Sequence, residues 1–209
     1  MFKMDKDQGF LKRAGELVAA GCELHAQGWV PATSGNFSAR VDDKSIAITV
    51  SGRHKGRLTS DDIMLIDYEG QSLDGKKPSA ETALHTQIYK HFPNANVVLH
   101  PHSPAATAIS RKLNSRLVLE NYELLKALAG IKTHAIKVGI PIFQNDQDIP
   151  RLAEEVAAYI KEYPDLKGYL IAGHGFYTWG ETADDALRHV EALEFLFDQE
   201  LRSLRISAP

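Results

Sequence analysis

Two histidines stand two positions apart, directly after a short apolar run near the middle of the chain. The run is Val97–Leu99, and His100 and His102 follow it. Apolar and mostly β-branched residues predict a buried strand. Residues i and i+2 of a strand point to the same face, so both imidazoles can reach one metal ion. Pro101 between them lacks a backbone donor, which suits the end of a strand.

A third histidine, His174, lies between two glycines, which let the backbone come close to a neighbouring segment. A His-x-His pair alone is more often two ordinary histidines, but His174 adds a ligand from a separate element, as a metal centre requires. Three imidazoles with no evident fourth ligand predict a catalytic ion with an open position, because a structural zinc site normally closes its shell with cysteine. Imidazoles suit zinc, with iron, cobalt or manganese as substitutes.

Three loops rich in hydroxyl groups and glycine predict a phosphate site when they are taken together. Hydroxyls, exposed glycine amides and a nearby cation are the groups that bind a phosphate dianion. In one loop Ser79 is expected at the N-cap of a helix, where the helix dipole favours an anion. Each loop alone is better explained as an ordinary turn. The candidate phosphate-binding residues are Ser34, Gly35, Asn36, Ser51, Gly52, Lys55 and Ser79.

Two acidic residues are candidates for proton transfer. Glu81 is expected in the first turn of the helix that Ser79 begins, where the helix dipole stabilises a carboxylate. Glu123, like Glu120, follows the apolar residues 117–119 at the start of another expected helix. A solvated surface acid is the alternative for each of them, and position alone does not separate the two interpretations.

The elements that must position these residues alternate between helical and strand patterns. Hairpins mixed with amphipathic helices predict a three-layer α/β/α fold with a mainly antiparallel central sheet. No repeat, low-complexity tract or linker divides the chain, so we expect residues 1–209 to form a single domain. We expect helices at 5–27, 79–91, 104–112, 121–129, 149–163 and from about 182 onward, and strands at 36–41, 45–50, 63–67, 97–100, within 131–143, at 168–172 and at 176–179.

Composition excludes several classes of protein. The chain has 209 residues, 44% of them hydrophobic, which is enough for one well-packed core. The net charge of −3 gives no basic excess that would favour nucleic acid or a membrane surface as a partner. One cysteine cannot form an intrachain disulfide, and no stretch has the pattern of a signal peptide or a membrane span. We therefore expect a cytoplasmic protein that acts on a small molecule.

With these features assembled, the chain resembles the class II aldolase/adducin superfamily over almost its whole length. Each motif alone is weak, and their order and spacing carry the resemblance. The motifs are Thr33-Ser34-Gly35-Asn36-Phe37-Ser38, the Ser51-Gly52 turn, Pro78-Ser79-Ala80-Glu81, His100-x-His102 and Gly173-His174-Gly175.

Within that superfamily the chain is similar to the branch of dehydratases that act in methionine salvage. The resemblance implies a zinc ion held by His100, His102 and His174, a phosphate held by the loops named above, and a homotetramer with active sites near subunit contacts. In that branch the glutamate matching Glu123 is the acid/base, whereas in the aldolases the acid matching Glu81 touches the metal and moves protons. Pro101 departs from the usual threonine, and we expect its side chain to point away from the metal. The motifs that carry the likeness are Ser51-Gly52-Arg53-His54-Lys55-Gly56, Lys77-Pro78-Ser79-Ala80-Glu81-Thr82-Ala83-Leu84-His85, Tyr122-Glu123-Leu124-Leu125-Lys126-Ala127-Leu128-Ala129-Gly130, Phe143-Gln144-Asn145-Asp146-Gln147-Asp148-Ile149 and Gly173-His174-Gly175-Phe176-Tyr177-Thr178-Trp179-Gly180.

The implied activity is loss of water from a methylthio-substituted ketose 1-phosphate. The main alternative is an aldolase or epimerase of the same superfamily, acting on fuculose, rhamnulose or ribulose phosphate. A non-catalytic, adducin-like interaction domain is disfavoured because all three histidines are present.

Overall fold

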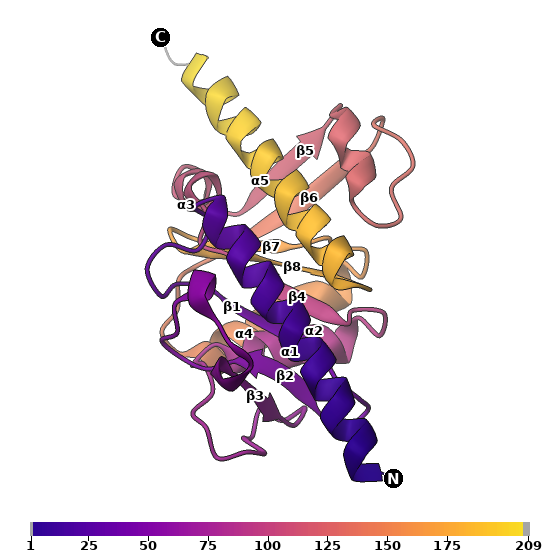
Figure 1. Ribbon diagram of the computed structural model, residues 1–209. Coiled ribbons are helices and arrows are strands. Elements are labelled where there is room, and N and C mark those ends of the chain that lie inside the picture. Colours follow the sequence, from indigo (N-terminus) through magenta and orange to yellow (C-terminus); the bar gives the residue numbers. More distant parts are fainter. Residues whose placement is uncertain (1, 207–209) are drawn as a thin grey trace.

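One eight-stranded sheet runs through the middle of the protein in the computed structural model, which describes residues 2–206 (Figure 1). The strand order is β3-β2-β1-β4-β8-β7-β6-β5. Among these strands every neighbouring pair is antiparallel except β6 and β7. The strands are β1 (Asn36–Arg40), β2 (Ile46–Thr49), β3 (Ile63–Ile66), β4 (Val97–His100), β5 (Arg116–Glu120), β6 (Lys137–Phe143), β7 (Tyr169–Ile171) and β8 (Gly175–Gly180).

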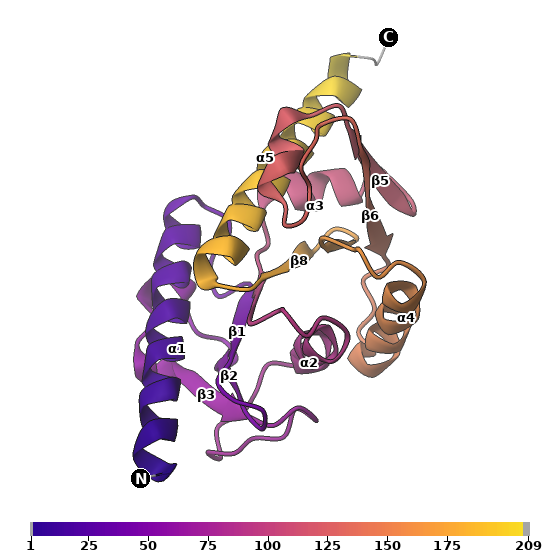
Figure 2. The ribbon, with the colours of Figure 1, turned by 90° about the vertical axis from the view of Figure 1, so that its right-hand side faces the viewer.

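Helices cover both faces of this sheet, which confirms the predicted three-layer α/β/α fold with a mainly antiparallel sheet (Figure 2). On one face lie α1 (Phe2–Ala26), α3 (Pro104–Ser110) and α5 (Ala183–Ile206), and on the other lie α2 (Thr82–His91) and α4 (Ile149–Glu162). Three short 3-10 helices complete the described part: η1 (Lys55–Arg57), η2 (Ser60–Asp62) and η3 (Glu123–Ala127). None of the described helices combines the length and apolar character needed to cross a bilayer.

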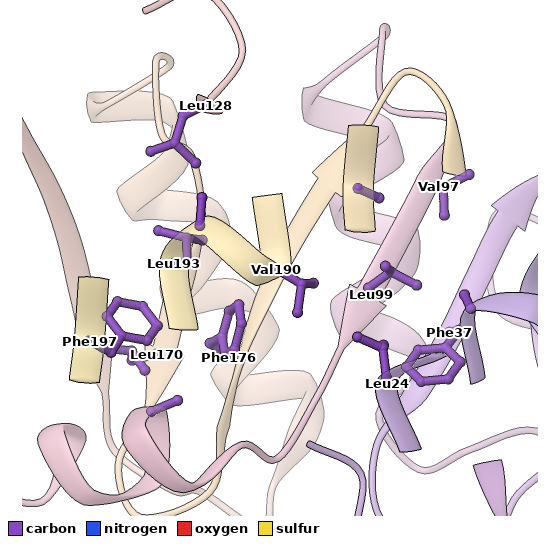
Figure 3. Packing of buried hydrophobic residues seen from close by; sticks show 14 of the residues in the cluster. Leu24, Phe37, Val97, Leu99, Leu128, Leu170, Phe176, Val190, Leu193 and Phe197 are labelled. Carbon is purple, nitrogen blue, oxygen red and sulfur yellow. The ribbon is translucent and has the colours of Figure 1, made fainter. Parts of the chain in front are cut away.

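The two-residue period of the strands divides the core between the two faces. Phe37, Val97 and Leu99 point toward α1 and α5 and belong to the same buried cluster as Phe176 and Phe197; Figure 3 shows Phe37 beside Leu24 of α1. The residues between them point the other way, toward α2 and α4, because successive strand side chains alternate. Polar residues on that second side of β1 therefore face α2, and this alternation places them behind the functional site.

Helix α1 positions the loop that carries a buried lysine. Its apolar stripe includes Ala14, Leu17 and Leu24, all at most 1% exposed. At Gly21 the helix meets η1 so closely that an added Cβ would collide with the carbonyl oxygen of Lys55. Only glycine permits this approach, so the start of η1 is held against α1.

Two of the expected elements are wrong in detail. Helix α2 begins at Thr82 with Glu81 as its N-cap, not at Ser79, because Ser79 lies in a turn whose carbonyl accepts from the Thr82 amide. In place of the expected α-helix at 121–129, the structure has the short 3-10 helix η3. Asn121, which precedes it, has a φ of 63°. A residue in the left-handed region cannot be part of a right-handed helix, so the helix begins only after Asn121, and the extended backbone of Leu128 ends it.

Truncating the aromatic core on the α5 side tests this packing. Phe197 is fully buried, and its ring meets that of Phe176 edge-to-face at 5.3 Å. Phe197→Ala is expected to lower the free energy of unfolding by about 3–5 kcal/mol, measured by urea denaturation at one protein concentration. The control is Leu11→Ala on α1, which is 57% exposed and should change stability by less than about 0.5 kcal/mol. Equal effects of the two variants would contradict the assignment of this core.

Candidate active site

The three histidines come from two places that the sheet brings together. His100 is the last residue of β4, and His102 follows two positions later. His174 lies in the turn between β7 and β8, and β8 is the direct neighbour of β4. Glycine is required beside it, because a Cβ at Gly175 would collide with the carbonyl oxygen of Pro101. The proline between the two histidines is compatible with their convergence, since their ring centroids are 4.6 Å apart.

Glu81 joins the histidines from the N-terminus of α2 and gives the cluster a fourth member. One ligand atom from each of Glu81, His100, His102 and His174 lies within 4.8 Å of the others. The Nε2 atoms of His100 and His102 are 2.9 Å apart. The carboxylate of Glu81 lies 3.6 Å from Nε2 of His100 and 3.4 Å from Nε2 of His174. Ligands of one zinc ion at about 2.0–2.2 Å from it are separated by comparable distances, so the cluster fits a single ion.

The protonation of the imidazoles also fits metal binding. Nδ1 of His100 donates to the carbonyl oxygen of Phe176 at 2.8 Å, which leaves Nε2 with a lone pair directed at the cluster. Burial, reinforced by His174, holds the pKa of His100 well below its ordinary value. Burial also lowers the pKa of His102, with a further contribution from His100. Neutral imidazoles are the form that binds a metal, so these side chains are ready to coordinate.

A pocket of about 280 Å³ opens beside the histidine cluster, and the three hydroxyl-rich loops line it. The sheet brings together the loop before β1, the loop after β2 and the turn before α2. The pocket is lined by Thr33, Ser34, Gly35, Asn36, Thr49, Val50, Ser51, Gly52, Lys55, Ser79, Glu81 and His102. All seven candidate phosphate-binding residues are in this set, next to two members of the metal cluster.

Lys55 is the buried cation of this pocket. Its ammonium donates to the carbonyl oxygens of Thr33 at 2.8 Å and Arg53 at 2.7 Å, so it joins the two loops. Its third N–H remains for an anion in the pocket. Burial lowers the pKa of Lys55 to about 8, and the nearby charge of Glu81 opposes this shift.

The hydroxyl groups of the pocket differ in their readiness to bind a phosphate. Ser79 Oγ accepts from the backbone amide of Glu81 at 3.3 Å and from the side-chain amide of Asn36 at 3.4 Å, so its own hydrogen is available. Ser34 Oγ instead donates to the carbonyl oxygen of Pro31 at 2.6 Å and would have to rotate. The side-chain amide of Asn36 is already committed to Glu81, at 2.6 Å.

Glu123 is the predicted site residue that the chain does not bring to the cluster. It lies on η3 with 73% of its side chain exposed, and it contacts Lys126 and His134. The hydrogen bond from Lys126 lowers the pKa of Glu123, which is opposite to the raised pKa expected for a general acid.

Two residues with a place behind this site, His85 and Ser38, were missed from the sequence, and Asn36 was given another role. Asn36 was assigned to the phosphate, whereas its side chain holds Glu81. His85 and Ser38 stand behind Asn36 in a buried hydrogen-bonded line. The signal was present in the spacing, because Glu81 and His85 are four apart on a helix and Asn36 and Ser38 are two apart on a strand.

Comparisons with known proteins agree with this architecture. The model of the class II aldolase and adducin N-terminal domain matches residues 15–201. The chain is 62% identical over 196 residues to methylthioribulose-1-phosphate dehydratase of Methylococcus capsulatus, covering 94% of this chain and 96% of that one. It is 52% identical to the protein of that name from Hahella chejuensis, covering all of both chains. The crystal structure of L-fuculose-1-phosphate aldolase from Thermus thermophilus superposes with a TM-score of 0.75 at 27% identity, covering 93% of this chain and 97% of that one.

The chain therefore belongs to the class II aldolase and adducin family. The relatives with which it shares more than half of its residues carry the name methylthioribulose-1-phosphate dehydratase, that is, they are hydro-lyases. Identity at this level over nearly the whole chain makes this protein an enzyme of the same class, a carbon–oxygen lyase.

Removing single histidines tests whether the cluster holds a metal. His100→Ala and His174→Ala are expected to bring bound metal from about one ion per chain to near zero, because each removes one imidazole from a set of three. Elemental analysis after gel filtration measures the loss. The control is His91→Ala, because His91 contacts the Gln87 carbonyl on α2 outside the cluster. Full metal content in either cluster variant would contradict the site.

Proposed function

We propose that this protein removes water from 5-methylthioribulose 1-phosphate and yields 5-methylthio-2,3-diketopentyl 1-phosphate, a step of methionine salvage in the cytoplasm. The observation that carries the proposal is one pocket in which a His/Glu cluster adjoins the loops that suit a phosphate. The identity of 62% to a methylthioribulose-1-phosphate dehydratase favours this substrate over other sugar phosphates. The proposal takes residues 1–209 as one domain.

The metal of the proposal is Zn²⁺, one per chain, held by His100, His102 and His174. A zinc ion bound there would act as a Lewis acid and stabilise negative charge on the oxygens at C2 and C3 of the substrate. Imidazole donors favour zinc over calcium or magnesium, and the absence of cysteine from the cluster favours a catalytic role.

Glu81 is the group proposed to take the proton from C3. Its Oε1 atom is buried, has no hydrogen-bond partner among the described residues and lies 3.4 Å from Nε2 of His174. Loss of the C3 proton and of the C4 hydroxyl forms an enol, and its tautomerisation gives the 2,3-diketone. The phosphate, bound by Lys55 and Ser79 away from the reacting carbons, orients C3 and C4 for this elimination.

Glu123 is proposed to protonate the departing C4 hydroxyl of a substrate bound in a neighbouring subunit. Within one chain its contacts are Lys126 and His134, outside the pocket. Beside it lies a groove of about 740 Å³ with exposed Leu124 and Phe195, a surface suited to burial against a second copy. Burial there would raise the pKa of the carboxyl and supply the acid that the reaction needs. The proposed assembly is a homotetramer.

A class II aldolase is the second candidate, because L-fuculose-1-phosphate aldolase shares the fold at 27% identity. An aldolase would release dihydroxyacetone phosphate from a ketose 1-phosphate, whereas the dehydratase forms a diketone without breaking a carbon–carbon bond. Mass spectrometry of products from methylthioribulose 1-phosphate and fuculose 1-phosphate separates these activities. Turnover of the first substrate with loss of water supports the proposal, and turnover of the second alone would contradict it.

Glu123→Gln tests the acid. It is expected to reduce elimination by roughly 10²–10⁴-fold, since a glutamine cannot donate the proton, while metal content stays unchanged. Glu120→Gln is the matched control on the same segment, because Glu120 pairs with Lys137 on the surface. Hybrids co-expressed from Glu81→Gln and Glu123→Gln chains are expected to regain activity if the two residues act across a subunit contact. A fully active Glu123→Gln enzyme would exclude the role.

The charge of Lys55 predicts a pH dependence. With a pKa of about 8, its ammonium is charged below that pH and neutral above it, so phosphate binding weakens as pH rises through 8. We expect kcat/KM to fall about tenfold per pH unit above this value, the slope of a single ionisation. Lys55→Met should bind substrate more weakly at neutral pH and lose this alkaline limb. If kcat/KM of Lys55→Met still fell above pH 8, the decrease would come from another group.

A further inference from the structure

A continuous line of buried side chains leads from the interior to Glu81. Tyr89 Oη lies 2.8 Å from Ser38 Oγ, which lies 2.7 Å from Nδ1 of His85. Nε2 of His85 contacts Oδ1 of Asn36, and Nδ2 of Asn36 donates to Oε2 of Glu81 at 2.6 Å. The four residues behind Glu81 are each at most 5% exposed. Burying polar side chains is unfavourable unless each has a hydrogen-bond partner, so every donor in this line must meet an acceptor.

The donors and acceptors of this line allow one arrangement with an ionised Glu81. A carboxylate only accepts hydrogen bonds, so Asn36 must present its NH₂ group to it. The amide oxygen then faces His85, so Nε2 of His85 must carry the proton. Its Nδ1 is then the acceptor and receives the hydroxyl hydrogen of Ser38. The oxygen of Ser38 remains free to accept from Tyr89.

The surroundings of His85 hold it in this state. Burial lowers the pKa of His85 to about 4, so the ring is neutral at physiological pH. Its ring meets that of Tyr177 edge-to-face at 5.3 Å, and Tyr177 stacks on His100 at 4.0 Å. Because His85 is four residues from Glu81 on α2 and faces β1, neither the ring nor the amide can move far without disturbing the core.

We propose that His85 is a positioning residue of the dehydratase reaction: through the side-chain amide of Asn36, it fixes the orientation of the Glu81 carboxylate beside the histidine cluster. Oε2 accepts from the amide and lies 3.6 Å from Nε2 of His100, and in this orientation Oε1, which has no hydrogen-bond partner among the described residues, lies 3.4 Å from Nε2 of His174. Without the His85 donor, the amide of Asn36 could reverse and place its oxygen against the carboxylate, and Glu81 would lose its fixed orientation. The expected effect on kcat rests on the proposed function. The orientation of Glu81 rests on the hydrogen bonds alone.

Two substitutions at this position separate the two hydrogen bonds of the ring. The Gln amide nitrogen lies near the place of Nε2, so His85→Gln keeps a donor for Asn36. The Asn amide lies near the place of Nδ1, so His85→Asn keeps the contact with Ser38 only. We expect His85→Asn to lower kcat by about 10–100-fold with little change in KM, a loss typical of outer-shell residues. We expect His85→Gln to stay close to the parent.

Thr86→Val is the control for a substitution in the same buried stretch of α2. Thr86 Oγ1 donates to the carbonyl oxygen of Ala83 and takes no part in the line. Equal kcat in all three variants, or equal losses in His85→Asn and His85→Gln, would overturn the positioning role. If the parent protein does not turn over methylthioribulose 1-phosphate, the proposed function is contradicted. The inference about His85 would then still be decided by its tautomer, which NMR measures without substrate.

The tautomer of His85 is observable without any substrate. In protein labelled with ¹⁵N-histidine, two-bond nitrogen–hydrogen NMR correlations identify the protonated ring nitrogen, and the His85 signals are those absent from His85→Gln. We expect a neutral ring with the proton on Nε2 across the neutral pH range. A neutral ring with its proton on Nδ1 would overturn the inference, because Nε2 would then be an acceptor and Asn36 could not present its NH₂ group to an ionised Glu81.

Discussion

The pairing of β4 with β1 on one side and β8 on the other is the constraint on which the site depends. This pairing sets the ends of three strands side by side, and with them the loops that carry the hydroxyl groups and His174. At Gly35, a Cβ would lie 2.7 Å from the carbonyl oxygen of His100, so the loop before β1 packs directly on the end of β4. A shift of one residue in either pairing would turn every side chain of the shifted strand to the opposite face, and the histidines would no longer meet.

The two sides of the sheet have different tasks. The side under α1 and α5 is apolar and supplies most of the packing that fixes the strands. The side under α2 mixes apolar residues with a polar line that ends at Glu81. Burying a carboxylate, three imidazoles and the ammonium of Lys55 close together is unfavourable unless each finds a partner. In the proposed function, a cation among the histidines and the substrate phosphate beside Lys55 would be such partners.

The sequence predicted the layers, seven of the eight described strands and residues of the pocket because those follow from local patterns, whereas strand β5 (Arg116–Glu120) was missed. Alternating and helical periods identify strands and helices, and His100, His102 and His174 are types that rarely serve packing alone. It did not predict where α2 begins or that residues 123–127 form a 3-10 helix, since one turn of backbone is decided by tertiary contacts. It also could not place Glu123, whose distance from the cluster depends on how the chain folds and, in the proposed assembly, on a second copy. The role of Asn36 was hidden because an amide near a turn is equally typical of a phosphate loop.

The account depends most on three imidazoles from two distant segments sharing one ion. X-ray absorption spectroscopy of the metal-loaded protein without substrate tests this most directly, because it counts the ligands around the ion. We predict three imidazole nitrogens at about 2.0–2.1 Å together with oxygen ligands, one of them lost or altered when Glu81 is replaced by alanine. A shell with fewer than three imidazoles, or one that contains sulfur, would contradict the account.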